Sequence, residues 1–241
     1  MHQTIWRTLY LIGLCLAIGF GCSTAHMAMP KDLPASTTVL PVLGKKAFSF
    51  DESFHFGDYA VTQVRRGWTR STAWSFMGFK SAKARQQYEF TLRPAAGGEW
   101  KAHCATGVKW KEMEFDNFLN TKGQLTWGIK SDLVFACTFE PAEGSPWKLV
   151  MGQGTDEMVM NGVLTDGQVE IAVEGIRELA GTSWPLMEPA GYSFRGPAGL
   201  LGAVEVLNTG EVRLASEIPA GQKDALACAS SALLLFRQIK K

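Results

Sequence analysis

The sequence has few of the residues that metal sites and hydrolytic centres need. It contains only four histidines, and because no HExxH or CxxC motif occurs, the zinc spacings that such motifs provide are excluded. In the region predicted to fold, only His55 and His103 remain, and a lone histidine supplies no metal geometry. We therefore expect no metal, no cofactor and no catalytic residue, and an enzyme is the least favoured class of function.

A surplus of charge of either sign is also missing. Lysine and arginine number 24 against 23 acidic residues, and loss of Arg7 with the leader described below leaves 23 of each. A chain balanced in this way has no broad basic field that would attract the phosphates of nucleic acid. We expect no nucleic-acid partner.

The chain opens on an apolar run that is short for a membrane-spanning helix. Arg7 precedes the uncharged residues 9–20, an order typical of a secretory signal peptide. The run ends in Ile18-Gly19-Phe20-Gly21-Cys22. A small residue followed by a cysteine at this point resembles the lipobox of bacterial lipoproteins, although that family prefers leucine where Gly19 stands.

The lipoprotein resemblance implies a signal peptide over residues 1–21 and acylation of Cys22, which would attach the protein to a membrane. Ser23 follows, without the aspartate that marks inner-membrane retention in that family. The implied address is the bacterial outer membrane, with the domain facing the periplasm and the cell surface as an alternative. The other interpretation is an ordinary signal peptide cut near Ala25, with Cys22 discarded.

Residues 22–46 are expected to form a flexible tether behind the acylated cysteine. This segment contains Pro30, Pro34 and Pro41 among small and hydroxyl residues. Prolines at this density disfavour both helices and central strands, so the segment is predicted to lift the domain off the bilayer.

From residue 47 onward the apolar residues recur with the period of a half-covered strand. In AFSFDESFHF, one face carries Phe48, Phe50, Phe54 and Phe56, while His55 lies on the other. Further predicted strands are YAVTQVRRGWTRS, QYEFTLR, EWKAHCA, LVFACTF, QLTWGIK, WKLVM, EMVMNGVL, QVEIAVEGI, GAVEVLN and EVRLA. The last two flank Asn208-Thr209-Gly210, a compact hairpin loop.

The segment from Ala225 to Phe236 contains no charge, and its apolar residues surround the whole circumference of a helix. Such a helix needs to be enclosed by other elements, which predicts a core helix over residues 223–238. Asp224 is expected at its beginning and Arg237 follows the uncharged segment, as the helix dipole favours. We predict one all-β domain over residues 47–241, an antiparallel barrel or wrapped sheet around this buried C-terminal helix.

This order of elements resembles the tubby-like superfamily, which includes the LURP-one-related proteins and the phospholipid scramblases. The resemblance rests on GYSFRGPAGLLGAVEVLNTGEVRLASEIPAGQKDALACASSALLLF, residues 191–236, which are similar to that family's final hairpins, linker and core helix. It covers about a fifth of the chain and implies a fold. The lipid and calcium functions of the family do not carry over, since no residues here match them.

Two cysteines occupy the inward faces of predicted strands. Cys104 and Cys137 are expected to form a disulfide, because an oxidising compartment allows one to persist. The alternative is a pair of buried free thiols.

The group Arg65, Arg66, Trp68 and Arg70 is the most suggestive binding feature of the sequence. Three guanidinium groups beside an indole suit an anionic headgroup, a sugar acid or an acidic protein. The alternative is an exposed strand edge that its charges protect from pairing with another chain.

These patterns predict a non-catalytic, membrane-anchored lipoprotein with a binding or structural role in the envelope. The alternative is a periplasmic protein that handles a lipid or another small ligand. A barrel filled by its own helix favours the first, and an open apolar cavity with an entrance favours the second. Convergent polar groups with perturbed pKa values would favour an enzyme.

Overall fold

The structure is a computed structural model that describes residues 24–45, 52–67, 86–107, 134–153 and 159–236. In these residues twelve strands precede one helix, α3 (Ala220–Leu235). The strands are β1 (Thr37–Pro41), β2 (Phe54–Phe56), β3 (Tyr59–Arg66), β4 (Gln86–Pro94), β5 (Trp100–Gly107), β6 (Val134–Pro141), β7 (Trp147–Gln153), β8 (Met160–Thr165), β9 (Glu170–Ile176), β10 (Gly191–Gly196), β11 (Gly199–Glu205) and β12 (Glu211–Ala215).

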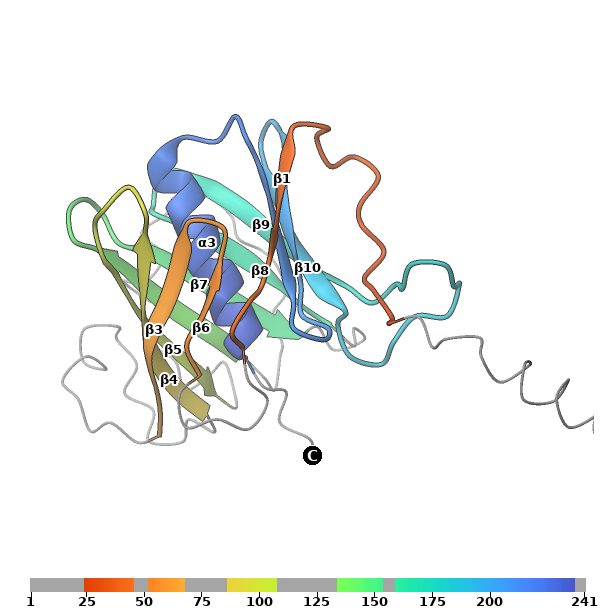
Figure 1. The fold of residues 1–241 in the computed structure, drawn as a ribbon, viewed down its shortest axis with the longest axis horizontal. Helices are drawn as coiled ribbons and strands as arrows, with labels where there is room; N and C mark the ends of the chain where they lie inside the picture. The colour runs from red at the N-terminus through yellow and green to blue at the C-terminus, as the bar shows by residue number, and fades with distance from the viewer. Residues whose placement is uncertain (1–23, 46–51, 68–85, 108–133, 154–158, 237–241) are drawn as a thin grey trace, which may run out of the picture.

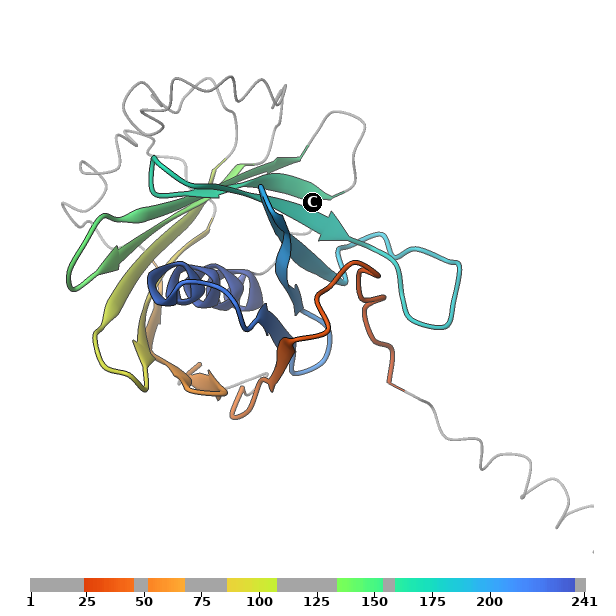
Figure 2. The same cartoon turned by 90° about the horizontal axis from the view of Figure 1, so that it is seen from above.

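The strands form one antiparallel sheet that curls into a nearly closed barrel (Figures 1 and 2). From β2 to β12 each strand pairs with the next along the chain, and β1 pairs with β12. The two edges of the sheet meet at a bridge between Leu43 and His55, whose amides and carbonyls exchange hydrogen bonds of 2.8 and 2.9 Å. Closure of this kind leaves few unpaired edge groups. The predicted all-β antiparallel barrel is confirmed.

Side chains alternate across the barrel wall as the sequence predicts. On β4, Tyr88, Phe90 and Leu92 point into the core with exposed fractions of 3%, 2% and 0%. On β2, Phe54 and Phe56 are buried while His55 is exposed. The first part of the predicted strand AFSFDESFHF and the candidate QLTWGIK lie outside the described residues.

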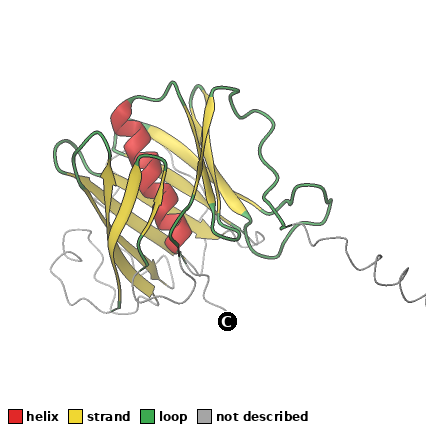
Figure 3. Ribbon diagram, in the orientation of Figure 1, coloured by secondary structure: helices red, strands yellow, loops and turns green. Residues whose placement is uncertain are grey.

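Helix α3 runs through the barrel and fills its interior (Figures 2 and 3). All of residues 225–235 are buried. Many are alanines, so the helix is slim enough to fit inside a wall of large aromatic side chains. Ser231 satisfies its hydroxyl by donating to the Ala227 carbonyl oxygen at 2.8 Å. No helix in the described part of the chain has the length and apolarity needed to cross a membrane.

The helix begins three residues earlier than the predicted 223–238, and it ends at Leu235. Pro219 precedes the first turn with φ −54°, and its carbonyl oxygen accepts from the Lys223 amide at 2.9 Å. Proline is well suited to this place because the first helical amides have no intrahelical acceptor. Asp224 therefore lies one turn inside the helix, and its predicted place at the beginning of the helix is wrong.

The flexible tether predicted over residues 22–46 is wrong for its described part, residues 24–45. β1 pairs with β12 over five residues, and both Met27 and Val42 are only 2% exposed. The strand tolerates Pro41 because, within the sheet, it pairs on one side only. The folded domain therefore begins before residue 47.

Candidate functional site at the open end of the barrel

A cavity of about 460 Å³ lies at the end of the barrel where α3 terminates. We call it the end pocket, and we call this end of the barrel the open end; it is at the lower end of α3 in Figure 1. Residues 233–236 of the helix end, 206–209 of the β11–β12 loop and 188–189 of the β9–β10 loop line it, together with Tyr192 and the charged side chains of Lys45, Glu52 and Arg66.

Arg66 joins the end of the helix to the barrel wall. Its Nε donates to both carboxylate oxygens of Glu52 at 2.7 and 2.9 Å, and its Nη2 donates to the same carboxylate at 2.8 Å. Nη2 also donates to the Leu235 carbonyl oxygen at 2.6 Å, at the negative end of the helix dipole. The guanidinium carbon lies 5.1 Å from the centre of the Tyr88 ring, within the range of a cation–π contact.

One nitrogen of the Arg66 guanidinium group makes no hydrogen bond to the described residues. Its Nη1 is buried and has no hydrogen-bond partner among the described residues. Buried donors are nearly always paired in folded proteins, so an unpaired one beside a cavity is a place where a ligand oxygen could bind. The pocket thus combines the Arg66 guanidinium group with the apolar side chains of Leu233, Leu234 and Phe236.

Two tyrosines of the wall hold the helix at different points. The Tyr88 hydroxyl donates to the Ala232 carbonyl oxygen at 2.6 Å near the open end, and the Tyr59 hydroxyl donates to Asp224 Oδ1 at 3.0 Å near the other end. Burial raises the pKa of both phenols, so they stay protonated as donors. Burial also raises the pKa of Asp224.

Of the predicted anionic site of Arg65, Arg66, Trp68 and Arg70, the structure describes only Arg65 and Arg66, and these two lie in different surroundings. Arg65 has a side chain that is 75% exposed and lies 3.5 Å from Glu89, whereas Arg66 is 21% exposed and binds Glu52. Trp68 and Arg70 lie outside the described residues. Arg65 fits the interpretation of a charged, exposed strand position, and Arg66 belongs to the end pocket.

The disulfide between Cys104 and Cys137 is present. The two residues face each other directly across β5 and β6, with Cα atoms 4.1 Å apart, and both are buried. The alternating pattern identified both inward faces, and the register of the two strands then makes them partners. The third described cysteine, Cys228, is a free thiol whose pKa is raised by burial.

Metal ligands do not gather in the part of the chain that the structure describes. It contains no group of three histidine, cysteine or acidic side chains arranged to hold an ion. His103 has one acidic neighbour, Glu89, at 3.7 Å, and His55 is exposed on β2.

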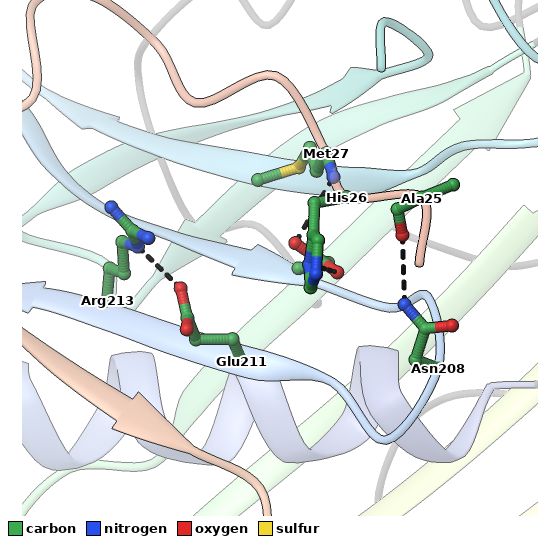
Figure 4. A network of polar contacts seen from close by, with 7 residues as sticks. Ala25, His26, Met27, Asn208, Glu211 and Arg213 are labelled. Carbon is green, nitrogen blue, oxygen red and sulfur yellow. Dashed lines mark hydrogen bonds and ion pairs between the residues drawn. The ribbon is translucent and has the colours of Figure 1, made fainter. Parts of the chain in front are cut away.

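Residues 25–28 dock against the outside of the barrel near the open end (Figure 4). The buried carboxylate of Glu205 accepts from the Met27 amide at 3.2 Å and lies 3.0 Å from His26 Nδ1. Asn208 donates its side-chain amide to the Ala25 carbonyl oxygen at 2.9 Å. We call residues 25–28 the docked N-terminal segment.

The docked N-terminal segment is also tied to the β9–β10 loop. The Ala28 amide donates to the Glu178 carbonyl oxygen, and the Ala180 amide donates to the His26 carbonyl oxygen, both at 2.9 Å. The Met27 side chain packs in a small apolar cluster with Ala190 and Ala203. Gly191 makes room for it, because a Cβ at that position would overlap the sulfur of Met27.

Sequence reasoning missed both the end pocket and the docked N-terminal segment. The residues that line the pocket are far apart in the chain, from Lys45 to Phe236, so no local sequence pattern predicts it. Residues 25–28 carry a weak signal in the alternation of Ala25, Met27 and Met29, but the nearby prolines dominated the interpretation.

Comparisons with known proteins give no relative. No protein-family model matches the chain, no curated protein matches it, and no solved structure matches it. The resemblances to bacterial lipoproteins and to the tubby-like superfamily therefore stay predictions.

Proposed function

We propose that the protein is a lipoprotein of the bacterial outer membrane, acylated on Cys22, whose barrel is a non-catalytic binding or structural module facing the periplasm. The observation that carries the non-catalytic part is the filled interior. Helix α3 occupies the volume in which a barrel of this kind would otherwise have a ligand-binding cavity or an active site.

The anchoring part of the proposal rests on the leader and on its short distance from the fold. Gly21-Cys22 closes an apolar run that follows Arg7. Only Ser23 and Thr24 separate Cys22 from Ala25, whose carbonyl oxygen is already bound by Asn208. An acyl chain on Cys22 would hold the domain directly at the bilayer, and two or more chains suffice for stable attachment.

The test is metabolic labelling with a fatty-acid probe. We expect the wild-type chain to be labelled and to sediment with outer membranes, and we expect Cys22→Ser to lose the label. Cys15→Ser is the matched control, since it removes the other leader cysteine and should leave the label unchanged. Labelling of the Cys22→Ser variant would contradict acylation at this residue.

A second candidate function is the binding of a small amphipathic anion in the end pocket. The buried Nη1 of Arg66, without a partner among the described residues, is the observation that favours it. Once a side-chain shift opened Nη1 to the pocket, a carboxylate or phosphate oxygen would satisfy this donor, and the apolar part of the ligand would contact Leu233 and Phe236.

Native mass spectrometry of the mature protein from its own host tests this candidate. A retained small molecule that is lost in Thr209→Trp, a change that fills the pocket from an exposed loop position, would support it. A mass without ligand in both proteins would count against it. The whole mature chain is needed, because β1 and Met27 belong to the fold.

A further inference from the structure

The β9–β10 loop exposes two large apolar side chains, Trp184 and Met187. Trp184 is 80% exposed and Met187 is 71% exposed, the highest values among the large apolar residues in the described ranges. Isolated exposed apolar residues are ordinary, but a tryptophan and a methionine three residues apart on one protruding loop are a candidate contact surface (Figure 1).

The loop is held in place by its own contacts. The Leu186 amide donates to the Arg177 carbonyl oxygen at 2.9 Å, and the Arg177 side chain donates back to the Leu186 carbonyl oxygen. Leu179 and Leu186 turn inward and pack against the cluster that contains Met27. These two leucines are partly buried, whereas Trp184 and Met187 are exposed to solvent.

The proposed anchor residue, Cys22, is only a few residues from the segment that contacts this loop. The docked N-terminal segment bridges to Leu179, and Cys22 is three residues before Ala25. Three Cα steps of 3.8 Å limit the distance between Cys22 and Ala25 to about 11 Å. Whatever surface holds the acyl chains must therefore lie close to the β9–β10 loop.

We propose that the two exposed side chains of this loop, Trp184 and Met187, dock into the headgroup and upper acyl layer of the bilayer that holds the anchor. This inference rests on the proposed acylation of Cys22. Tryptophan favours this layer because its ring has an apolar body and one polar N–H group, and methionine adds a flexible apolar contact. The neighbouring Glu178 and Glu188 are exposed, so attraction to anionic lipids does not contribute.

Loop docking fixes the orientation of the barrel. The open end lies near the bilayer, because Asn208 of the β11–β12 loop binds Ala25. The β4–β5 turn, which contains the exposed Ala96, lies at the opposite end and faces away (Figure 1).

The experiment places an environment-sensitive fluorophore at Met187→Cys in the mature, acylated full chain. Ala96→Cys is the matched control at the opposite end. The other described cysteines do not compete, because Cys104 and Cys137 are bonded and Cys228 is buried. Each labelled protein is reconstituted into vesicles of phosphatidylethanolamine and phosphatidylglycerol, with and without lipids that carry a nitroxide quencher.

We expect severalfold stronger quenching at position 187 than at position 96, and added salt should not reduce it. Equal quenching at the two positions in acylated protein would overturn the docking proposal. The intact mass of each preparation is measured first. A chain that lacks acyl groups overturns the proposed lipoprotein function itself, so the two failures are distinguishable.

Discussion

The surroundings of helix α3 in the interior of the barrel differ from those at the open end. In the interior, α3 leaves residues 225–235 buried against a wall of apolar side chains. At the open end, the last turn of α3 borders a cavity of about 460 Å³, and the charged pair Arg66–Glu52 contacts the helix terminus.

The difference separates the part of the molecule that stabilises the fold from the part that is available for binding. A filled interior gives the largest burial of apolar surface, but it offers no space to a ligand. Candidate contacts with other molecules collect at the open end, where the end pocket, the docked N-terminal segment and the β9–β10 loop lie. Substitutions in the interior should therefore lower the free energy of unfolding strongly, and substitutions towards the ends should lower it less.

The largest effect is expected from Leu226→Asp. Leu226 is 0% exposed in the interior, so the variant would bury a charge without a partner, and we expect it not to fold. Circular dichroism and chemical denaturation of the purified protein measure this. Met187→Asp, at an exposed position, is the control and should unfold like wild type. A cooperatively folded Leu226→Asp protein would show that α3 is peripheral.

The next largest effect is expected in the wall. Replacing both Cys104 and Cys137 by alanine should lower the free energy of unfolding by about 3 kcal/mol, mainly because the unfolded chain is no longer cross-linked. Urea denaturation with and without reductant measures this change. Reductant should destabilise the wild type and leave the double variant unchanged. Equal sensitivity of the two proteins to reductant would contradict a stabilising disulfide.

Arg66→Met tests the border between the two regions. It removes one partner of the half-buried Glu52 carboxylate and the side-chain donor to the Leu235 carbonyl oxygen, and we expect a loss of about 2 kcal/mol. Arg65→Met, one residue earlier, removes a largely exposed charge and should cost about 0.5 kcal/mol or less. Denaturation of both variants in the same buffer measures the contrast. Equal losses would mean that the position of Arg66 at the helix end has no special role.

The smallest effect is expected at the other end of the helix. Burial raises the pKa of Asp224 in the folded protein. Its contribution to stability is therefore fully present below the unfolded pKa, about 3.9, and is lost as the pH rises through the higher folded value. Asp224→Asn has no such dependence. Denaturation is measured at a series of pH values. As the pH rises through this range, the free energy of unfolding of the variant should increase relative to that of the wild type, and at higher pH the difference should stay constant.

Much of the fold could be predicted because its determinants are local. Alternating residues such as Tyr88, Phe90 and Leu92 specify which side of a strand faces the core, and an uncharged segment such as residues 225–236 must be enclosed. The disulfide followed from two inward-facing cysteines. The boundaries were less accurate, because Pro219 moves the helix start to Ala220 and an edge strand accepts Pro41.

The open end could not be predicted, because it depends on contacts between distant parts of the chain. Arg65 and Arg66 are neighbours in sequence, yet only Arg66 reaches Leu235. The partner of Ala25 is Asn208, and the partner of the Met27 amide is Glu205. These pairs come together only when the barrel closes, and local sequence patterns do not predict them.

The order of elements along the chain has a consequence for how the molecule is made. Helix α3 follows β1–β12, so the strands leave the ribosome before the segment that fills them. A chain interrupted before Pro219 would have a curved sheet with an apolar inner face and nothing to cover it, a surface prone to aggregation and proteolysis. Because β1 pairs with β12 and the wall encloses a helix that follows both, closure of the barrel depends on contacts between distant parts of the chain, which we expect to form late in folding. We therefore expect chains that lack α3 to be degraded faster than chains that contain it.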